Sequence, residues 1–243
     1  MSTKKTIGII GGMGPWATLD LFEKILRFTD AKKDQDHIHI LIDCNSDIPD
    51  RTAAIINSAP SPFPKIRDSA LRLESAGADF IIIACNTSHY FINDLRAAVK
   101  APFLSIVEET AKFIMKEGYE TAILLGTDGS KKVGIYRKSL EQYNIKAIYP
   151  DETMQKEITD LIYLGIKSGK KEWDVTDLNK QIQDMESKYK NAVFVLACTE
   201  LPIAQKKYGM IGNFIDPSSI LAVAAIKHAG YNTTNNISFF EQA

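Results

Sequence analysis

Short apolar segments recur along the chain, and a small or polar turn follows each of them. These segments are hydrophobic almost throughout and rich in β-branched residues, which is the pattern of parallel strands buried on both faces. They are residues 6–10, 39–43, 80–84, 121–125 and 192–197. The pattern therefore predicts five buried strands.

Between these segments, apolar residues recur at helical spacing. The predicted helices are residues 17–28, 65–75, 91–99, 107–116, 132–142, 153–166, 175–189 and 220–227. Strands that alternate with helices favour right-handed crossovers and a doubly wound α/β fold, in which helices flank parallel sheets.

Two motifs repeat about halfway along the chain. Gly11 and Gly126 each follow an apolar strand and lie 115 residues apart. Cys85 and Cys198 also each end an apolar strand, and they lie 113 residues apart. Because the two offsets nearly agree, we interpret the two halves of the chain as related lobes.

The predicted fold has two similar Rossmann-like (flavodoxin-like) lobes related by pseudo-twofold symmetry. We expect the first lobe to comprise residues 1–101 and 213–243, and the second to comprise residues 102–212. In open α/β sheets, ligands bind at the carboxyl ends of the strands. The site is therefore expected between the lobes, where the repeated motifs end their strands.

Composition and charge narrow the class of protein. The 243 residues are 45% hydrophobic and 24% charged, as in ordinary globular proteins. A formal net charge of -1 without a long basic block predicts no nucleic-acid or membrane partner, so we expect a small-molecule ligand. No apolar run reaches the roughly 18 residues of a membrane span, and residues 7–10 are too short for a signal-peptide core. We therefore expect a cytoplasmic protein.

The chain has three cysteines, Cys44, Cys85 and Cys198, and their spacing indicates neither a disulfide framework nor a metal site. Buried free cysteines often only fill space, but two in matching positions favour chemistry. Helix-start amides after Cys85 and Cys198 are expected to hold an anion and to lower the thiol pKa from about 8.5. Cys44 has no counterpart, and we expect it in the core.

Two opposed thiols suit racemisation. Inversion at Cα requires a base on one face and an acid on the other, and a thiol pKa can be tuned close to the working pH. The developing carbanion resembles an enediolate, which amides around the α-carboxylate stabilise. Such a reaction needs no pyridoxal phosphate, so no cofactor is expected.

Four segments of the chain resemble the aspartate/glutamate racemase superfamily, and within it the aspartate racemase branch. They are GIIGGMGP at 8–15, IPDRT at 48–52, ACNTSH at 84–89 and ACTELP at 197–202. This resemblance implies a racemase independent of pyridoxal phosphate that interconverts L- and D-aspartate, with glutamate as a further candidate substrate. It also implies a homodimer.

The resemblance assigns roles to nine residues. Cys85 and Cys198 match the catalytic pair. Arg51 matches the residue that binds the distal carboxylate, and Lys167 matches a second cationic position. The competing interpretations are an exposed arginine at a helix start and a solvated lysine at a helix end. The residues that match α-carboxylate binding are Asn86, Thr87 and Thr199, and those that match the pocket wall are Met13 and Thr127.

Three positions depart from the family pattern or have an open role. Glu200 stands where glutamate racemases carry histidine, which argues against a histidine-assisted proton relay. Ser105 stands where many aspartate racemases have histidine, so altered substrate choice stays open. His89, four residues after Cys85, could face the site, although a capping or structural role is favoured.

Other functions stay open at this point. A related decarboxylase or dicarboxylate isomerase would use cysteines at the same positions, but the presence of both Cys85 and Cys198 favours racemisation. A protein that only binds a dicarboxylate would not need both thiols. A nucleotide-binding Rossmann protein is disfavoured because Gly11, Gly12 and Gly14 lack the GxGxxG spacing.

Overall fold

The computed structural model describes residues 4–235, 237 and 240–241, and it contains two sheets. The first has the strand order β2-β1-β3, and the second β5-β4-β6-β7-β8. All pairs are parallel except β7 with β8. The strands are β1 (Ile7–Gly11), β2 (Ile40–Cys44), β3 (Phe80–Ile83), β4 (Thr121–Leu125), β5 (Lys146–Ile148), β6 (Ala192–Leu196), β7 (Phe214–Ile215) and β8 (Phe240–Glu241).

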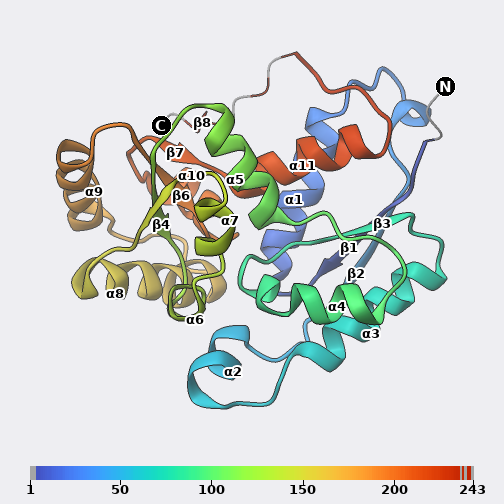
Figure 1. Ribbon diagram of the computed structural model, residues 1–243, viewed down its shortest axis with the longest axis horizontal. Helices are drawn as coiled ribbons and strands as arrows, with labels where there is room; N and C mark the ends of the chain where they lie inside the picture. Colours follow the sequence, from blue (N-terminus) through green and yellow to red (C-terminus); the bar gives the residue numbers. More distant parts are fainter. Residues whose placement is uncertain (1–3, 236, 238–239, 242–243) are drawn as a thin grey trace.

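Helices flank both sheets, which confirms the predicted α/β class (Figure 1). The α-helices are α1 (Pro15–Phe28), α2 (Arg51–Asn57), α3 (Phe63–Ser75), α4 (Ile92–Ala98), α5 (Ile106–Lys116), α6 (Asp128–Val133), α7 (Arg137–Glu141), α8 (Glu152–Asp160), α9 (Thr176–Lys188), α10 (Leu201–Tyr208) and α11 (Pro217–His228). Short 3-10 helices span Asp34–Asp36 and Thr87–Phe91, and a π-helix spans Leu161–Lys167. None of the helices in the described ranges has both the length and the apolar character that crossing a membrane requires.

The two sheets repeat one strand order. β1 lies between β2 and β3 just as β4 lies between β5 and β6. A parallel bridge from Phe103 to Ile81 takes the next position in the first sheet, where the second sheet has β7. The repeat inferred from the glycine and cysteine motifs is therefore present in the fold. The division into residues 1–101 with 213–243 and 102–212 remains a proposal. Near its boundaries, Phe103 pairs in the first sheet and β7 pairs in the second.

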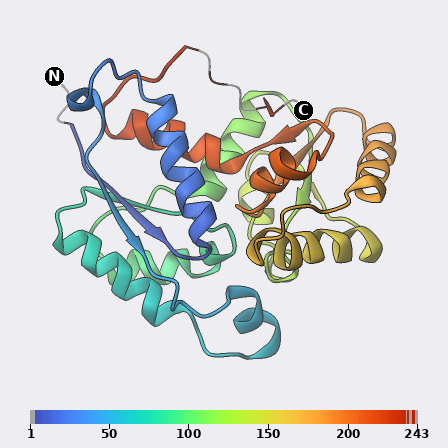
Figure 2. The ribbon, with the colours of Figure 1, turned by 180° about the vertical axis from the view of Figure 1, so that it is seen from behind.

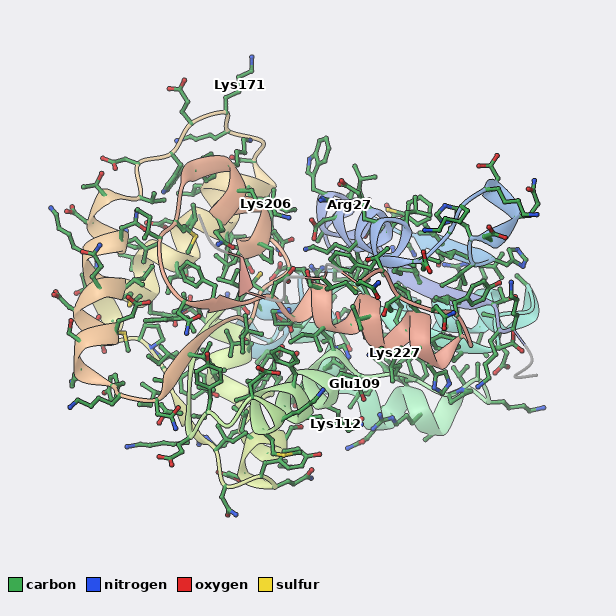
Figure 3. The ribbon with its side chains drawn as sticks, turned by 90° about the horizontal axis from the view of Figure 1, so that it is seen from above. Arg27, Glu109, Lys112, Lys171, Lys206 and Lys227 are labelled. Atoms are coloured by element: carbon green, nitrogen blue, oxygen red, sulfur yellow. The ribbon has the colours of Figure 1, made fainter. Side chains whose placement is uncertain are left out.

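Three helices join the halves. α11 packs against both α1 and α5 (Figures 1 and 2), and Figure 3 shows α11 between the two ends of the molecule, with Lys227 on α11 and Lys112 on α5 labelled. Apolar residues of β1, β4, β6, α5 and α11 form one core cluster. Since α11 is apolar nearly all round, it is buried on all sides rather than amphipathic. This shared core holds the two sheets in a fixed arrangement.

A buried ion network ties α1 to the start of α11. Lys24 Nζ lies 2.7 Å from Asp216 Oδ2 and also pairs with Asp20. Asp216 is fully buried, and its carboxylate caps α11 by accepting from the backbone N–H of Ser218 at 2.8 Å. The positive charge of Lys24 lowers the pKa of Asp216 despite the opposing effect of burial.

Three local predictions were wrong. The segment 39–43, predicted as a buried strand, forms β2, and none of the residues of β2 is buried. The helix predicted over 132–142 is divided into α6 and α7, because Gly134 adopts a left-handed conformation with φ 60° and ends α6. Cys44, predicted in the core, is exposed. It ends β2, which is the edge strand of the first sheet, and an edge strand is not covered as a central strand is.

Candidate functional site

A small cavity of about 10 Å³ lies where β1, β3, β4 and β6 end and their connecting turns meet. Its lining residues are Met13, Asp50, Arg51, Thr52, Cys85, Asn86, Thr87, Thr127, Tyr163, Lys167, Cys198, Thr199 and Glu200. All nine residues singled out from the sequence are among them. The fold therefore brings together residues from both repeats at the predicted edge of the sheets.

The turn after β1 requires glycine. Gly12 has φ +86°, and a Cβ there would lie 2.3 Å from the backbone of Asn45. This tight turn places the carbonyl of Met13 where Arg51 Nη2 donates to it at 2.6 Å. The sulfur of Met13 in turn accepts a hydrogen bond of 3.2 Å from the hydroxyl of Ser88. Met13 thus forms a fixed wall of the cavity.

The two halves meet across the cavity through hydroxyl groups. Thr87, just after Cys85, and Thr127, at the start of α6, lie with their Oγ1 atoms 3.1 Å apart. Both side chains are buried. This contact joins the turn after β3 of the first sheet to the turn after β4 of the second.

Cys85 lies beside a buried guanidinium. Arg51 is only 7% exposed, which contradicts its interpretation as a surface residue. Its Nη1 donates to the carbonyl of Pro49 at 3.0 Å, so the side chain is held in place. Burial opposes the charge of Arg51, but nearby Cys85 and Asp50 raise its pKa. The guanidinium of Arg51 and the sulfur of Cys85 therefore interact within the cavity.

Cys198 has the opposite environment. Its thiol donates a hydrogen bond of 2.9 Å to Oε2 of Glu200. Burial and the charge of Glu200 raise the pKa of Cys198 well above its ordinary value, although Lys167 acts in the other direction. The expectation that helix-start amides lower the pKa of both thiols is therefore wrong for Cys198, because the carboxylate and the burial outweigh them.

The π-helix after α8 brings two further side chains to the site. The ammonium group of Lys167 lies 4.4 Å from the ring centroid of Tyr163 and 3.9 Å from Asp50 Oδ2. Burial disfavours the charge of Lys167, yet Glu200 and Cys198 raise its pKa. Its side chain is only 23% exposed, so it does not merely decorate a solvated helix end. The site thus has two cationic side chains, Arg51 from the first half of the chain and Lys167 from the second half.

Three buried polar atoms of the cavity residues have no hydrogen-bond partner among the described residues. They are Nε of Arg51, Nδ2 of Asn86 and Oε1 of Glu200. Tyr136 donates to Asn86 Oδ1 at 2.5 Å, which holds this amide in one orientation. Buried polar groups are normally paired because desolvation without a partner is costly. Two donors and one acceptor are therefore available to a polar ligand.

Asp50, Thr52, Tyr163 and Glu200 line the cavity but were not assigned to it from the sequence. Asp50 and Thr52 flank Arg51 in a matched motif, and Glu200 stands in another, so adjacency was the available signal. Tyr163 had no such signal. Its hydroxyl donates to Asp50 Oδ2 at 3.3 Å, a contact between residues 113 apart in the chain.

Two of the residues whose roles the sequence left open, His89 and Ser105, have structural roles. His89 lies outside the residues that line the cavity, and its Nδ1 donates to the carbonyl of Cys85 at 3.0 Å. Burial lowers its pKa to about 4. Ser105 caps α5 by accepting from the backbone N–H of Glu108 at 3.3 Å. Within the described ranges, no three His, Cys, Asp or Glu side chains are grouped to hold a metal ion.

Known proteins are similar to this chain in sequence and in fold. The family model described as Asp/Glu/Hydantoin racemase matches residues 10–225. The broad specificity amino-acid racemase RacX of Bacillus subtilis is 29% identical over 232 residues, which cover 90% of this chain and 96% of RacX. The structure of Picrophilus torridus aspartate racemase is 34% identical, with a TM-score of 0.79 and coverage of 95% of this chain and 96% of that one.

A more distant structure has the same fold. Glutamate racemase of Francisella tularensis, solved in complex with D-glutamate, is 18% identical with a TM-score of 0.66. The match covers 98% of this chain and 86% of that one.

Proposed function

Because the chain belongs to the Asp/Glu/hydantoin racemase family, we propose that it is an amino-acid racemase that interconverts L- and D-aspartate without a cofactor, with glutamate as a further candidate substrate. One observation carries this proposal. Cys85 and Cys198, from equivalent positions of the two repeats, line one cavity together with the cations Arg51 and Lys167.

The proposed reaction moves one proton off Cα and another onto it. A thiolate on one face takes the Cα proton, the electrons of the broken C–H bond delocalise onto the α-carboxylate, and the thiol on the other face supplies a proton to Cα. The product has inverted configuration, and the two sulfurs have exchanged protonation states. Each positioned acid or base contributes about 10²–10⁴-fold to such a rate.

The environment of Cys198 supports a definite division of roles. Burial and Glu200 favour the protonated form of the Cys198 thiol. We infer that Cys198 acts as the acid in the first turnover, and that Cys85, which lies beside Arg51, acts as the base. The enantiomer that presents its Cα proton to Cys85 would react directly with this division of roles.

Charge supports an acidic substrate. In our proposal Arg51 and Lys167 bind the distal carboxylate, since a buried anion needs cationic partners. Asn86, with its free Nδ2, binds the α-carboxylate together with the hydroxyl groups of Thr87 and Thr199. Met13 and Thr127 form the walls. The family resemblance further supports a homodimer. We also propose that the protein works in the cytoplasm.

The proposal is tested by incubating the purified protein in D₂O with each enantiomer of aspartate and of glutamate, without added cofactor. Proton NMR follows deuteration at Cα, and chiral chromatography follows inversion. We expect deuterium at Cα of both enantiomers and convergence on a racemic mixture for aspartate. Inertness of all four substrates would overturn the proposal.

A further inference from the structure

Glu200 has a feature that the proposed roles of the thiols leave unexplained. Its side chain is 2% exposed, and one carboxylate oxygen is already used: Oε2 accepts hydrogen bonds from Cys198 at 2.9 Å and from the hydroxyl of Thr199 at 3.3 Å. The other oxygen, Oε1, is buried without a partner. Holding Cys198 in place accounts for Oε2 alone.

The surroundings of Oε1 restrict what could satisfy it. Glu200 lines the cavity, and Oε1 lies close to the turn after β1, since a Cβ added to Gly14 would be 3.3 Å from it. A side chain at Gly14 would therefore crowd this oxygen. A buried carboxylate oxygen accepts hydrogen bonds only, so its ligand must donate, and a cationic donor binds most strongly.

We propose that Oε1 of Glu200 binds the α-ammonium group of the substrate. This inference rests on the proposed function and deepens it, because the two carboxylates of an acidic amino acid do not distinguish it from a dicarboxylate without an amino group. Arg51 and Lys167 attract both kinds of ligand. Glu200 attracts the ammonium group and repels a ligand that has only carboxylates, so it makes the site selective for amino acids.

The same contact helps to fix the orientation of the substrate's Cα between the two sulfurs. With the distal carboxylate on the cations, the α-carboxylate on Asn86 and the ammonium group on Glu200, three substituents of Cα are held. The remaining substituent, the proton, then points to one sulfur or the other according to configuration. Glu200 is therefore a specificity-determining residue that also positions Cys198.

The test compares racemic aspartate with succinate, which has the same two carboxylates but no amino group. Isothermal titration calorimetry measures both affinities on wild type, on Glu200→Gln and on Glu117→Gln, a control at an exposed glutamate. A racemic ligand is used so that turnover does not change its composition. Circular dichroism checks that each variant is folded.

We expect Glu200→Gln to weaken aspartate binding about 10- to 100-fold, the value of a hydrogen bond to a charged group, and to leave succinate binding equal or stronger. Glu117→Gln should change neither affinity. Equal losses for the two ligands would overturn the inference. Wild type alone gives a second test, because it should prefer aspartate to succinate, and equal affinities would also overturn it. Racemisation by wild type separately decides the proposed function, so the two failures are distinguishable.

Discussion

Cys198 and Glu200 are joined by a hydrogen bond of 2.9 Å from a buried thiol to a buried carboxylate. The contact differs from that of Cys85, whose neighbour is the guanidinium of Arg51. Two thiols at equivalent positions of a repeated fold thus have environments of opposite charge. This asymmetry favours the protonated form of Cys198, which suits it to be the acid of the proposed reaction.

The raised pKa of Cys198 predicts a loss of stability at alkaline pH. Burial and Glu200 favour the protonated thiol in the folded state, so its pKa there lies above that in the unfolded chain. The contribution is fully present below the unfolded thiol pKa of about 8.5 and is lost as pH rises through the folded value. Urea unfolding from pH 7 to 10 should show a steeper decline for wild type than for Cys198→Ser.

Cys44→Ser is the control for this experiment, because the thiol of Cys44 is exposed. The stability of Cys44→Ser should decline with pH in parallel with that of wild type. If the stability of Cys198→Ser also declines in parallel, the thiol of Cys198 is not held protonated by the fold.

Arg51 is expected to determine affinity for the distal carboxylate. Arg51→Lys keeps a charge but loses the planar fork and the bonds to the carbonyls of Met13 and Pro49, so kcat/KM for aspartate should fall. Arg51→Ala should cost more, about 1.5–3 kcal/mol of transition-state stabilisation. Steady-state kinetics on both variants, with Arg27→Ala at an exposed arginine as a control, measures this. Unchanged kcat/KM in Arg51→Ala would remove Arg51 from the site.

The lowered pKa of His89 predicts that the protein loses stability at acidic pH. Its pKa is lowered by burial to about 4, so the folded state favours the neutral ring. The contribution of His89 to the free energy of unfolding is fully present above the unfolded pKa of about 6.5. This contribution, about 3 kcal/mol, is lost as pH falls toward 4. His89→Asn, which can still donate to the carbonyl of Cys85, should lose less stability between pH 7 and pH 4.5 in urea unfolding. Equal losses would show that the ring is not buried in its neutral form.

Lys24 is expected to be important for stability although it lies outside the site. Lys24→Met leaves the charge of Asp216 buried without its partner, which typically costs about 3–5 kcal/mol. Thermal and urea unfolding measure the change, and Lys65→Met, at an exposed ion pair, should have little effect. The double variant Lys24→Met with Asp216→Asn should recover part of the loss. No recovery would mean that packing, rather than the unpaired charge, dominates.

Much of the fold follows from local pattern. The strand at Thr121–Leu125 was predicted with its observed bounds, because a short, mostly apolar run between turns is distinctive. Convergence of the site residues followed from the motifs at strand ends. An apolar run does not reveal whether its strand is central or at an edge, however, which is why Cys44 was misplaced.

The rest depends on contacts between distant residues. Tyr163 reaches the site through a π-helix and contacts Asp50 from the other half of the chain, and no local pattern encodes that pairing. The pKa of Cys198 depends on where the carboxylate of Glu200 points, a side-chain orientation that the sequence ACTELP does not specify. Most residues of the cavity could be identified from the sequence, but the combined effect of their charges and burial on the pKa of Cys198 could not.

The central claim is that Cys85 and Cys198 each serve one face of Cα. It is tested most directly by following Cα deuteration and chirality of both aspartate enantiomers in D₂O with Cys85→Ala and Cys198→Ala. Each variant should lose racemisation by about 10²–10⁴-fold. Each should exchange the Cα proton of only one enantiomer, with opposite preferences, because the remaining thiol still reaches its own face. A folded single-cysteine variant that racemises aspartate at a rate close to wild type would contradict the account.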